Sequence, residues 1–139
     1  MIGEVNVFQL IDRKSEILSK KADLFKKLFN TRIPKYILGI NYLCDNLIKV
    51  FNKKNINLTG IIDDFTDLCL YQGVKVYKLS DIEKDSLVIS CVVDGKLITA
   101  IDNIKNQGVH HILSYFDLCL YDNTLFVEPN FLQKSFIDI

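Results

Sequence analysis

Residues 35–64, with the sequence KYILGINYLCDNLIKVFNKKNINLTGIIDD, decide the fold class of this chain. The stretch opens with a short, continuous apolar run at residues 36–38, which Gly39 ends, and it closes with a second run at residues 58–62. Between the runs, apolar residues recur at helical spacing, at Leu43, Leu47, Val50 and Phe51. Unbroken apolar runs are typical of parallel strands that are covered on both faces of a sheet. The stretch therefore predicts a strand, a helix and a second strand of an α/β sheet.

Three further apolar runs follow, at residues 74–77, 87–93 and 109–113. Before the last of them, a helix face closed by Gly108 is formed by Leu97, Ile98, Ile101 and Ile104. The S-x-x-E pattern at residues 80–83 predicts a capping box and a helical turn that starts at Ser80. We therefore expect residues 35–115 to form an open, doubly wound α/β sheet of about five parallel strands in the order 3-2-1-4-5.

The two ends of the chain have different patterns. Apolar residues between Phe8 and Phe29 recur with a helical period opposite a lysine-rich face, and Pro34 ends this pattern. Residues 1–34 are thus predicted to be an amphipathic helix that packs on its own domain or pairs with a second copy, because a free helix would leave its Leu and Phe side chains in water. Residues 116–139 show no clear period and are expected to be a C-terminal arm or linker.

The chain has 139 residues, the size of a single domain, and its 17 Lys and Arg balance 17 Asp and Glu. A net charge of zero argues against a nucleic-acid-binding protein, which needs excess positive charge to neutralise phosphates. The charge is unevenly distributed, because residues 1–35 carry eight Lys or Arg against four Asp or Glu. We interpret this basic segment as a solvated helix face, with a membrane surface or an acidic partner as the alternative.

No stretch reaches the roughly 18–20 apolar residues that a membrane span requires, and the first residues lack a signal-peptide pattern. We therefore expect a cytoplasmic protein. The cysteines form no C-x-x-C pair, so Cys44, Cys69, Cys91 and Cys119 are expected to be small apolar fillers. His110 and His111 are adjacent and would point to opposite faces of a strand, so no metal site is expected.

A ligand in such a sheet binds at the carboxyl ends of the strands, where the strand order reverses. The loops at this place contribute the candidate ligand-binding residues Gly39, Asn41, Tyr42, Asp63, Asp64 and Asp94. Against the dinucleotide pattern G-x-G-x-x-G, the first turn reads G-x-N-x-x-C, with Asn41 and Cys44 in place of two glycines. Backbone amides at the helix start still favour an anion, but a side chain occupies the place of a diphosphate.

Asp63 lies 24 residues after Gly39, where an acidic residue would accept a hydrogen bond from a ribose hydroxyl. The alternative is that Asp63 and Asp64 only end the strand and start a turn. The expected ligand is a nucleotide or a nucleotide sugar. We predict no catalytic residue, and we interpret Cys91 as a core residue, not a nucleophile.

Four segments carry a resemblance to a known family: YILGIN at residues 36–41, GIIDD at 60–64, GVKVYKLSDI at 73–82 and LVIS at 87–90. Over about residues 10–125 the chain resembles the Rossmann-like accessory domain that precedes the catalytic domain of FkbM-type sugar methyltransferases. Similar domains begin sugar-modifying acyltransferases and sugar-nucleotide dehydratases. The relatives commonly have a glycine-rich first turn, from which this chain departs at Asn41 and Cys44.

The resemblance implies a non-catalytic, Rossmann-like module that binds a sugar nucleotide or glycan intermediate in surface-polysaccharide (capsule) modification. In the relatives a methyltransferase domain follows, so this chain is expected to be either an excised domain or a short stand-alone relative. The alternative is a dimerisation or interaction module with a vestigial nucleotide pocket, whose helix at residues 8–29 supplies the interface. A third hypothesis, an enzyme that acts on a bound nucleotide, has only Asp63, Asp64 and Asp94 as candidate acids or bases. The expected partners are a sugar nucleotide and either a second copy or a catalytic partner domain, with no nucleic acid.

Overall fold

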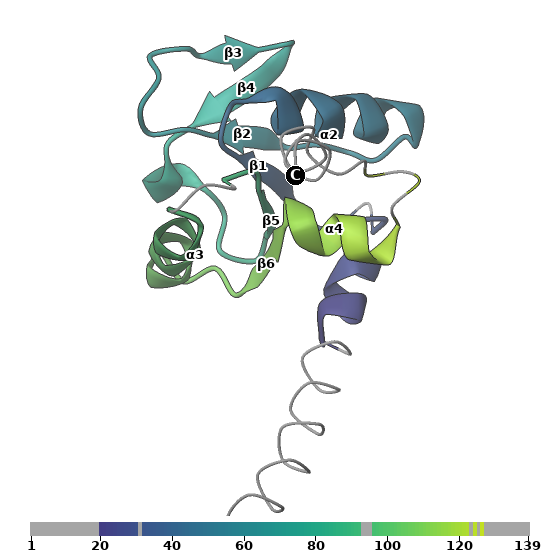
Figure 1. The fold of residues 1–139 in the computed structure, drawn as a ribbon. Coiled ribbons are helices and arrows are strands. Elements are labelled where there is room, and N and C mark those ends of the chain that lie inside the picture. Colours follow the sequence, from purple (N-terminus) through teal and green to yellow (C-terminus); the bar gives the residue numbers. More distant parts are fainter. Residues whose placement is uncertain (1–19, 31, 93–95, 123, 125, 127–139) are drawn as a thin grey trace, which may run out of the picture.

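The computed structural model describes residues 20–30, 32–92, 96–122, 124 and 126, and every structural statement below concerns these residues. They form an α/β fold around a six-stranded, mostly parallel open sheet in the order β3-β4-β2-β1-β5-β6 (Figure 1). The strands are β1 (Lys35–Leu38), β2 (Gly60–Ile62), β3 (Leu70–Tyr71), β4 (Val74–Tyr77), β5 (Leu87–Ser90) and β6 (His111–Ser114). The helices are α2 (Tyr42–Lys53), α3 (Leu97–Asn106) and α4 (Tyr115–Tyr121), with a short 3-10 helix, η1 (Leu79–Asp81).

The five parallel strands follow the predicted order, since β4, β2, β1, β5 and β6 lie side by side. The central strand β1 pairs in parallel with both neighbours, so Ile37 lies between Ile61 and Ile89. The apolar runs did not predict β3, which pairs antiparallel with β4 at the edge of the sheet. Positive φ angles at Gln72 and Gly73 form the two-residue turn that joins β3 to β4. A strand of two residues is too short to leave a pattern in the sequence.

Helices cover both faces of the sheet, as the unbroken apolar strands require. On one face, Leu47 and Phe51 of α2 pack with Leu118 of α4 on the central strands. On the other face, Ile104 of α3 packs with Tyr36 and Val88. Figure 1 shows α3 on one side of the sheet and α2 and α4 on the other. The predicted face of α3 is wrong at Ile98, whose side chain is exposed.

Residues 20–27 form the described part of the N-terminal helix, and they pack on their own domain. Leu28, just after this helix, is fully buried, and the ring of Phe25 stacks on Tyr121 of α4 with centroids 5.3 Å apart. Lys21 Nζ forms an ion pair with Asp117 Oδ2 of α4 at 2.8 Å. Of the two expected uses of the amphipathic helix, this part shows own-domain packing, and residues 8–19 lie outside the described residues.

Two local expectations differ from the structure. The expected arm begins with a helix, α4, because Ser114 and Asp117 cap each other's backbone N–H group in a capping box. The capping box predicted at Ser80 is wrong: η1 begins earlier, at Leu79, with Lys78 at the N-cap. The amide of Leu79 donates instead to Asp64 Oδ1, at 2.8 Å, so the partner comes from a distant part of the sequence.

None of the helices within the described ranges combines the length and the apolar character that crossing a bilayer requires.

Candidate functional site

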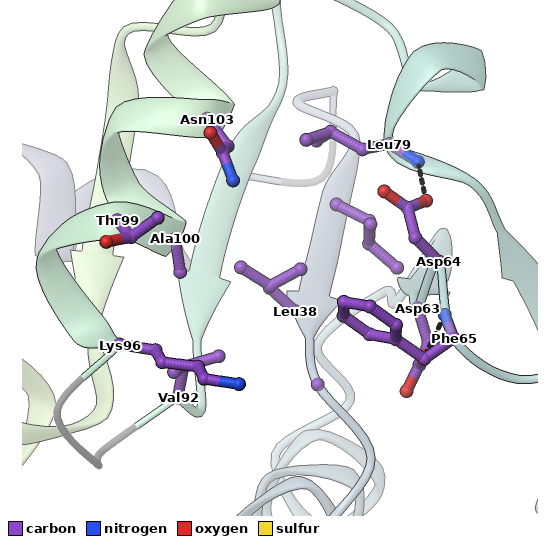
Figure 2. Close-up of a pocket in the computed structure, with 12 residues that line it drawn as sticks. Leu38, Asp63, Asp64, Phe65, Leu79, Val92, Lys96, Thr99, Ala100 and Asn103 are labelled. Atoms are coloured by element: carbon purple, nitrogen blue, oxygen red, sulfur yellow. Dashed lines mark hydrogen bonds between the residues drawn. The ribbon is translucent and has the colours of Figure 1, made fainter.

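A cleft of about 250 Å³ lies at the carboxyl ends of β1, β2 and β5, on the side of the sheet that α3 covers (Figure 2). Its apolar floor is formed by Leu38, Ile62 and Val92, which follow or end these three strands. Asp63 and Asp64 line one wall, and Lys96 and Asn103 line the other. The cleft therefore lies where the strand order predicts a ligand site.

Gly39 makes the sharp turn from β1 toward α2. Its φ angle is +98°, in the left-handed region that a side chain disfavours, and its amide donates to the carbonyl of Ile62 at 3.0 Å. The backbone conformation of this turn therefore requires the first glycine of the pattern. Gly39 also lines the cleft and so lies at the predicted site.

Asn41 is the N-cap of α2 and uses both ends of its amide. Its Oδ1 atom accepts hydrogen bonds from the amides of Leu43 at 3.0 Å and Cys44 at 3.1 Å. Its Nδ2 atom donates to the carbonyl of Cys91, at 3.0 Å, which holds the turn against the loop after β5. The amides that would bind a phosphate in a glycine-rich turn are therefore already paired with a side-chain oxygen.

The structure brings three of the six predicted site residues together in the cleft: Gly39, Asp63 and Asp64. Asn41 and Tyr42 lie outside its lining, and the Tyr42 side chain is exposed at the start of α2. Asp94 lies outside the described residues.

The two aspartates at the end of β2 each use one carboxylate oxygen to hold a turn. Asp63 Oδ1 accepts from the amides of Phe65 at 2.8 Å and Thr66 at 3.2 Å, and Asp64 Oδ1 accepts from Leu79. The Oδ2 atom of each makes no hydrogen bond with the described residues. The structure therefore shows the turn role of both aspartates, and because both also line the cleft, a ligand role for their carboxylates stays a prediction.

The opposite wall was missed by sequence reasoning. Lys96, Thr99, Ala100 and Asn103 follow one another along one side of α3 and its N-cap, at helical spacing. Figure 2 shows this wall facing Asp64, Phe65 and Leu79, with Leu38 between the two. The sequence signal for this wall was the helical spacing of the polar residues at positions 96, 99 and 103.

Phe65 lines the cleft although its side chain is fully exposed. It follows Asp63 and Asp64 in the loop after β2, at the rim of the cleft in Figure 2. An aromatic ring that lines a cleft and covers nothing behind it is available to stack on a flat ligand.

The cysteines near the turn are core residues. Burial raises the pKa of Cys91 well above its ordinary value, and burial with the nearby Asp45 carboxylate raises the pKa of Cys44 to about 12. Neither thiol forms a thiolate at neutral pH, which supports the interpretation of Cys91 as a core residue. Only Cys69 is exposed, which corrects the expectation that all four cysteines are fillers. In the part of the chain that the structure describes, no His, Cys, Asp and Glu side chains gather in a group that could hold a metal ion.

A scan against protein-family models finds no matching family for this chain, and searches of curated proteins and of solved structures find no match either.

Proposed function

We propose that this chain is a Rossmann-like, non-catalytic module that binds the nucleoside part of a sugar nucleotide in the cleft between the loop after β2 and α3. The observation that carries the proposal is the pair of Asp63 and Asp64, whose Oδ2 atoms have no partner among the described residues in a cleft with an apolar floor. The resemblance of residues 36–41, 60–64, 73–82 and 87–90 to the accessory domains of FkbM-type methyltransferases supports the proposal that this binding serves surface-polysaccharide modification.

The lining suits a ligand with hydroxyl groups at one end and a flat apolar ring at the other. A carboxylate can accept hydrogen bonds from two neighbouring sugar hydroxyls, and we assign this role to Asp63 and Asp64, which line the cleft. A base lying over Leu38 and Ile62 would be covered at the rim by the ring of Phe65. The amide of Asn103, on the facing wall, can donate to and accept from the edge of such a base.

The phosphates contribute little in this arrangement, because Asn41 already pairs with the amides of Leu43 and Cys44. Binding energy must come from the base and the sugar. We therefore expect a nucleoside to bind about as tightly as its sugar diphosphate, unlike in a glycine-rich turn, where the helix start binds the phosphate.

The cleft has no group arranged for catalysis among its described residues. Its two carboxylates hold turns through their Oδ1 atoms, and the nearby thiols of Cys44 and Cys91 stay protonated. A binding role that presents the sugar part to a catalytic partner domain is consistent with this lining.

Calorimetry with uridine, adenosine, guanosine and thymidine, and with the nucleotide sugars of each, tests the proposal. One nucleoside series should bind, and at a hundred times its dissociation constant the ligand should add about 2.7 kcal/mol to the free energy of unfolding. Ala100→Phe fills the cleft from the α3 wall and should abolish binding, whereas Asp102→Asn, outside the cleft lining on the same helix, should leave it unchanged. No heat across the whole panel, with a folded protein, would contradict the proposal.

Asn41→Gly tests the role of the turn itself. The substitution frees two amides for a phosphate, and since charge-assisted hydrogen bonds contribute about 1.5–3 kcal/mol, the affinity for the nucleoside diphosphate relative to the nucleoside should rise about tenfold or more. Asn41→Ser keeps a capping oxygen and should leave this ratio unchanged. Equal ratios in the wild type and Asn41→Gly would show that the side chain does not replace a phosphate.

The alternative, a dimerisation module built on residues 8–29, has its own test. Deleting residues 1–30 would remove the fully buried Leu28, so the deletion should stop at residue 19. Light scattering that shows a dimer before this deletion and a monomer after it would favour the alternative.

A further inference from the structure

A second groove, of about 380 Å³, lies across β6 at the edge of the sheet. One wall is the helix at residues 20–27, the other wall is α3, and alternate residues of the β6 segment lie between them. The groove shares no lining residue with the cleft at Asp63, so the two can be tested independently of each other.

The groove has an apolar floor. Leu24 comes from the helix at residues 20–27, Ile101 from α3 and Ile112 from β6. The three side chains are only partly buried, so each keeps surface that a ligand can cover. Covering this surface would contribute free energy in proportion to the apolar area removed from water.

The walls of the groove carry uncompensated positive charge. Lys20 lies on one wall and Lys105 on the other, and neither makes a hydrogen bond or an ion pair with a described residue. The acid in the groove, Asp117, is already neutralised by Lys21, at 2.8 Å, and its Oδ2 atom also accepts from the amide of Ser114, at 2.9 Å. Among the residues that the structure describes, the groove therefore presents ammonium groups from two elements without a free carboxylate to balance them.

We propose that this groove binds a small amphipathic anion, namely an organic carboxylate, sulfonate or phosphate that carries an apolar body. The apolar body would lie on Leu24, Ile101 and Ile112, and the anionic group would lie between Lys20 and Lys105. Charge complementarity selects this occupant, because a neutral apolar molecule would leave both ammonium groups unpaired and an inorganic anion would leave the apolar floor in water. Lys20 belongs to the basic segment of residues 1–35, so the proposal gives one of these basic residues a specific role.

The test uses three probes on the full chain. 8-Anilinonaphthalene-1-sulfonate has both an aromatic body and a negative charge, N-phenyl-1-naphthylamine has the body without the charge, and inorganic phosphate has the charge without the body. Fluorescence titration should show saturable 1:1 binding of the sulfonate that is at least tenfold tighter than that of the amine. Phosphate should not displace it at equal concentration, whereas dodecanoate and dodecyl phosphate should, and their relative strength separates a carboxylate ligand from a phosphate ligand.

Charge variants locate the site. Lys20→Ala and Lys105→Ala should each weaken binding of the sulfonate several-fold, and together about tenfold or more, with little change for the neutral amine. Lys53→Ala, in the last turn of α2 outside the groove, is the matched loss of one positive charge and should have no effect.

A floor variant and a cleft variant complete the test. Ile101→Ala should weaken binding of both aromatic probes, and Ala100→Phe, which fills the nucleoside cleft, should weaken neither. The proposal is overturned if the double lysine variant binds the sulfonate as the wild type does, or if Ala100→Phe removes the binding. Loss of nucleoside binding in Ala100→Phe with unchanged sulfonate binding would keep the two sites distinct.

Discussion

Asn41, at the turn between β1 and α2, makes three hydrogen bonds with one side chain. Two of them satisfy amides that the start of a helix leaves unpaired, and the third fixes the loop after β5. A glycine at this position would leave the same amides open to a ligand. The side chain of this single residue therefore closes the turn on itself, and we expect Asn41→Gly to open the turn to a phosphate.

Lys35 is a fully buried cation at the start of β1. Its Nζ atom donates to the carbonyls of Asn30 and Ile33, in the loop between the N-terminal helix and β1. Burial lowers the pKa of Lys35, because the charged form loses its hydration. The lysine ties the first segment to the sheet, at the cost of burying a charge.

Gly60 gives a prediction at this scale. A Cβ atom at Gly60 would lie 2.3 Å from Tyr77 Cε2, so Gly60→Ala must displace the tyrosine ring. That ring packs edge-to-face on Tyr36 with centroids 5.4 Å apart. We expect Gly60→Ala to lower the free energy of unfolding by about 1–3 kcal/mol, measured by urea denaturation.

A double-mutant cycle provides the control. Tyr77→Ala removes the ring that causes the clash, so Gly60→Ala should cost clearly less in that background. If the losses in the free energy of unfolding from Gly60→Ala and Tyr77→Ala simply add, Gly60 is required for a reason other than the Tyr77 ring.

At the scale of elements, the same five residues, DLCLY, form two different structures. At residues 117–121 they lie within α4, where Leu118 is buried and Asp117 completes a capping box with Ser114. At residues 67–71 they form a loop and β3, with Leu68 and Cys69 exposed. The match is a chance one with no structural repeat behind it, since neighbouring residues and packing decide the conformation.

We expect the contact between the N-terminal helix and β6 to depend on pH. Lys27 Nζ lies 3.3 Å from Nδ1 of His111, and burial, Lys27 and His110 lower the pKa of His111, against a smaller opposite effect of Asp85. The unfolded state then binds more protons than the folded state between the lowered pKa and the ordinary value of 6.5. The free energy of unfolding should therefore rise with pH through this interval and be lower on its acidic side.

Lys27→Met should raise the pKa of His111 and reduce this pH dependence. An NMR titration of the imidazole and urea denaturation at both ends of the interval measure the two effects. Lys26→Met, an exposed lysine of the same helix, removes an equal charge and should change neither. An unchanged His111 titration in Lys27→Met would mean that burial alone sets its pKa.

For the whole molecule, a formal net charge of zero combines with exposed apolar side chains near one sheet edge. Phe65 is 100% exposed, Leu68 51% and Leu70 63%, all close to the two-residue edge strand β3. Zero net charge removes the repulsion between copies, and an exposed edge favours pairing. We expect the protein to self-associate at neutral pH and high concentration.

Leu68→Lys with Leu70→Lys should raise the solubility limit at neutral pH and leave the free energy of unfolding within about 0.5 kcal/mol, because neither side chain is in the core. Concentration-dependent light scattering measures the first effect, and urea denaturation measures the second. The control is Ile98→Lys with Leu120→Lys, which adds the same charge at two exposed positions away from β3 in the sequence. Equal gains from both pairs would assign the effect to net charge and not to this edge.

Much of the fold was predictable, since a strand buried on both faces has to be apolar along its length. The runs at β1, β2, β4, β5 and β6 and their order followed from this requirement and from right-handed crossovers. The hairpin strand β3 and the helix α4 were not predicted. β3 has only two residues and leaves no pattern, and α4 begins at a capping box of Ser114 and Asp117, which apolar periodicity does not reveal.

The candidate site, like the fold, was predictable from the sequence only in part. Gly39, Asp63 and Asp64 follow strands, and the ends of parallel strands meet at one edge of the sheet. The α3 wall and the hydrogen bond from Asn41 to the Cys91 carbonyl depend on how the elements pack, because each joins residues far apart in the sequence.

By itself the sequence determined the parallel sheet, its strand order and the carboxylates at its edge, because the periods and ends of apolar runs are local properties of the chain. Only the tertiary structure decided that Asn41 donates to the Cys91 carbonyl in the loop after β5, that α3 completes the cleft and that Lys20 and Lys105 line one groove. Each of these arrangements joins residues separated by tens of positions, and their proximity arises only when the core packs.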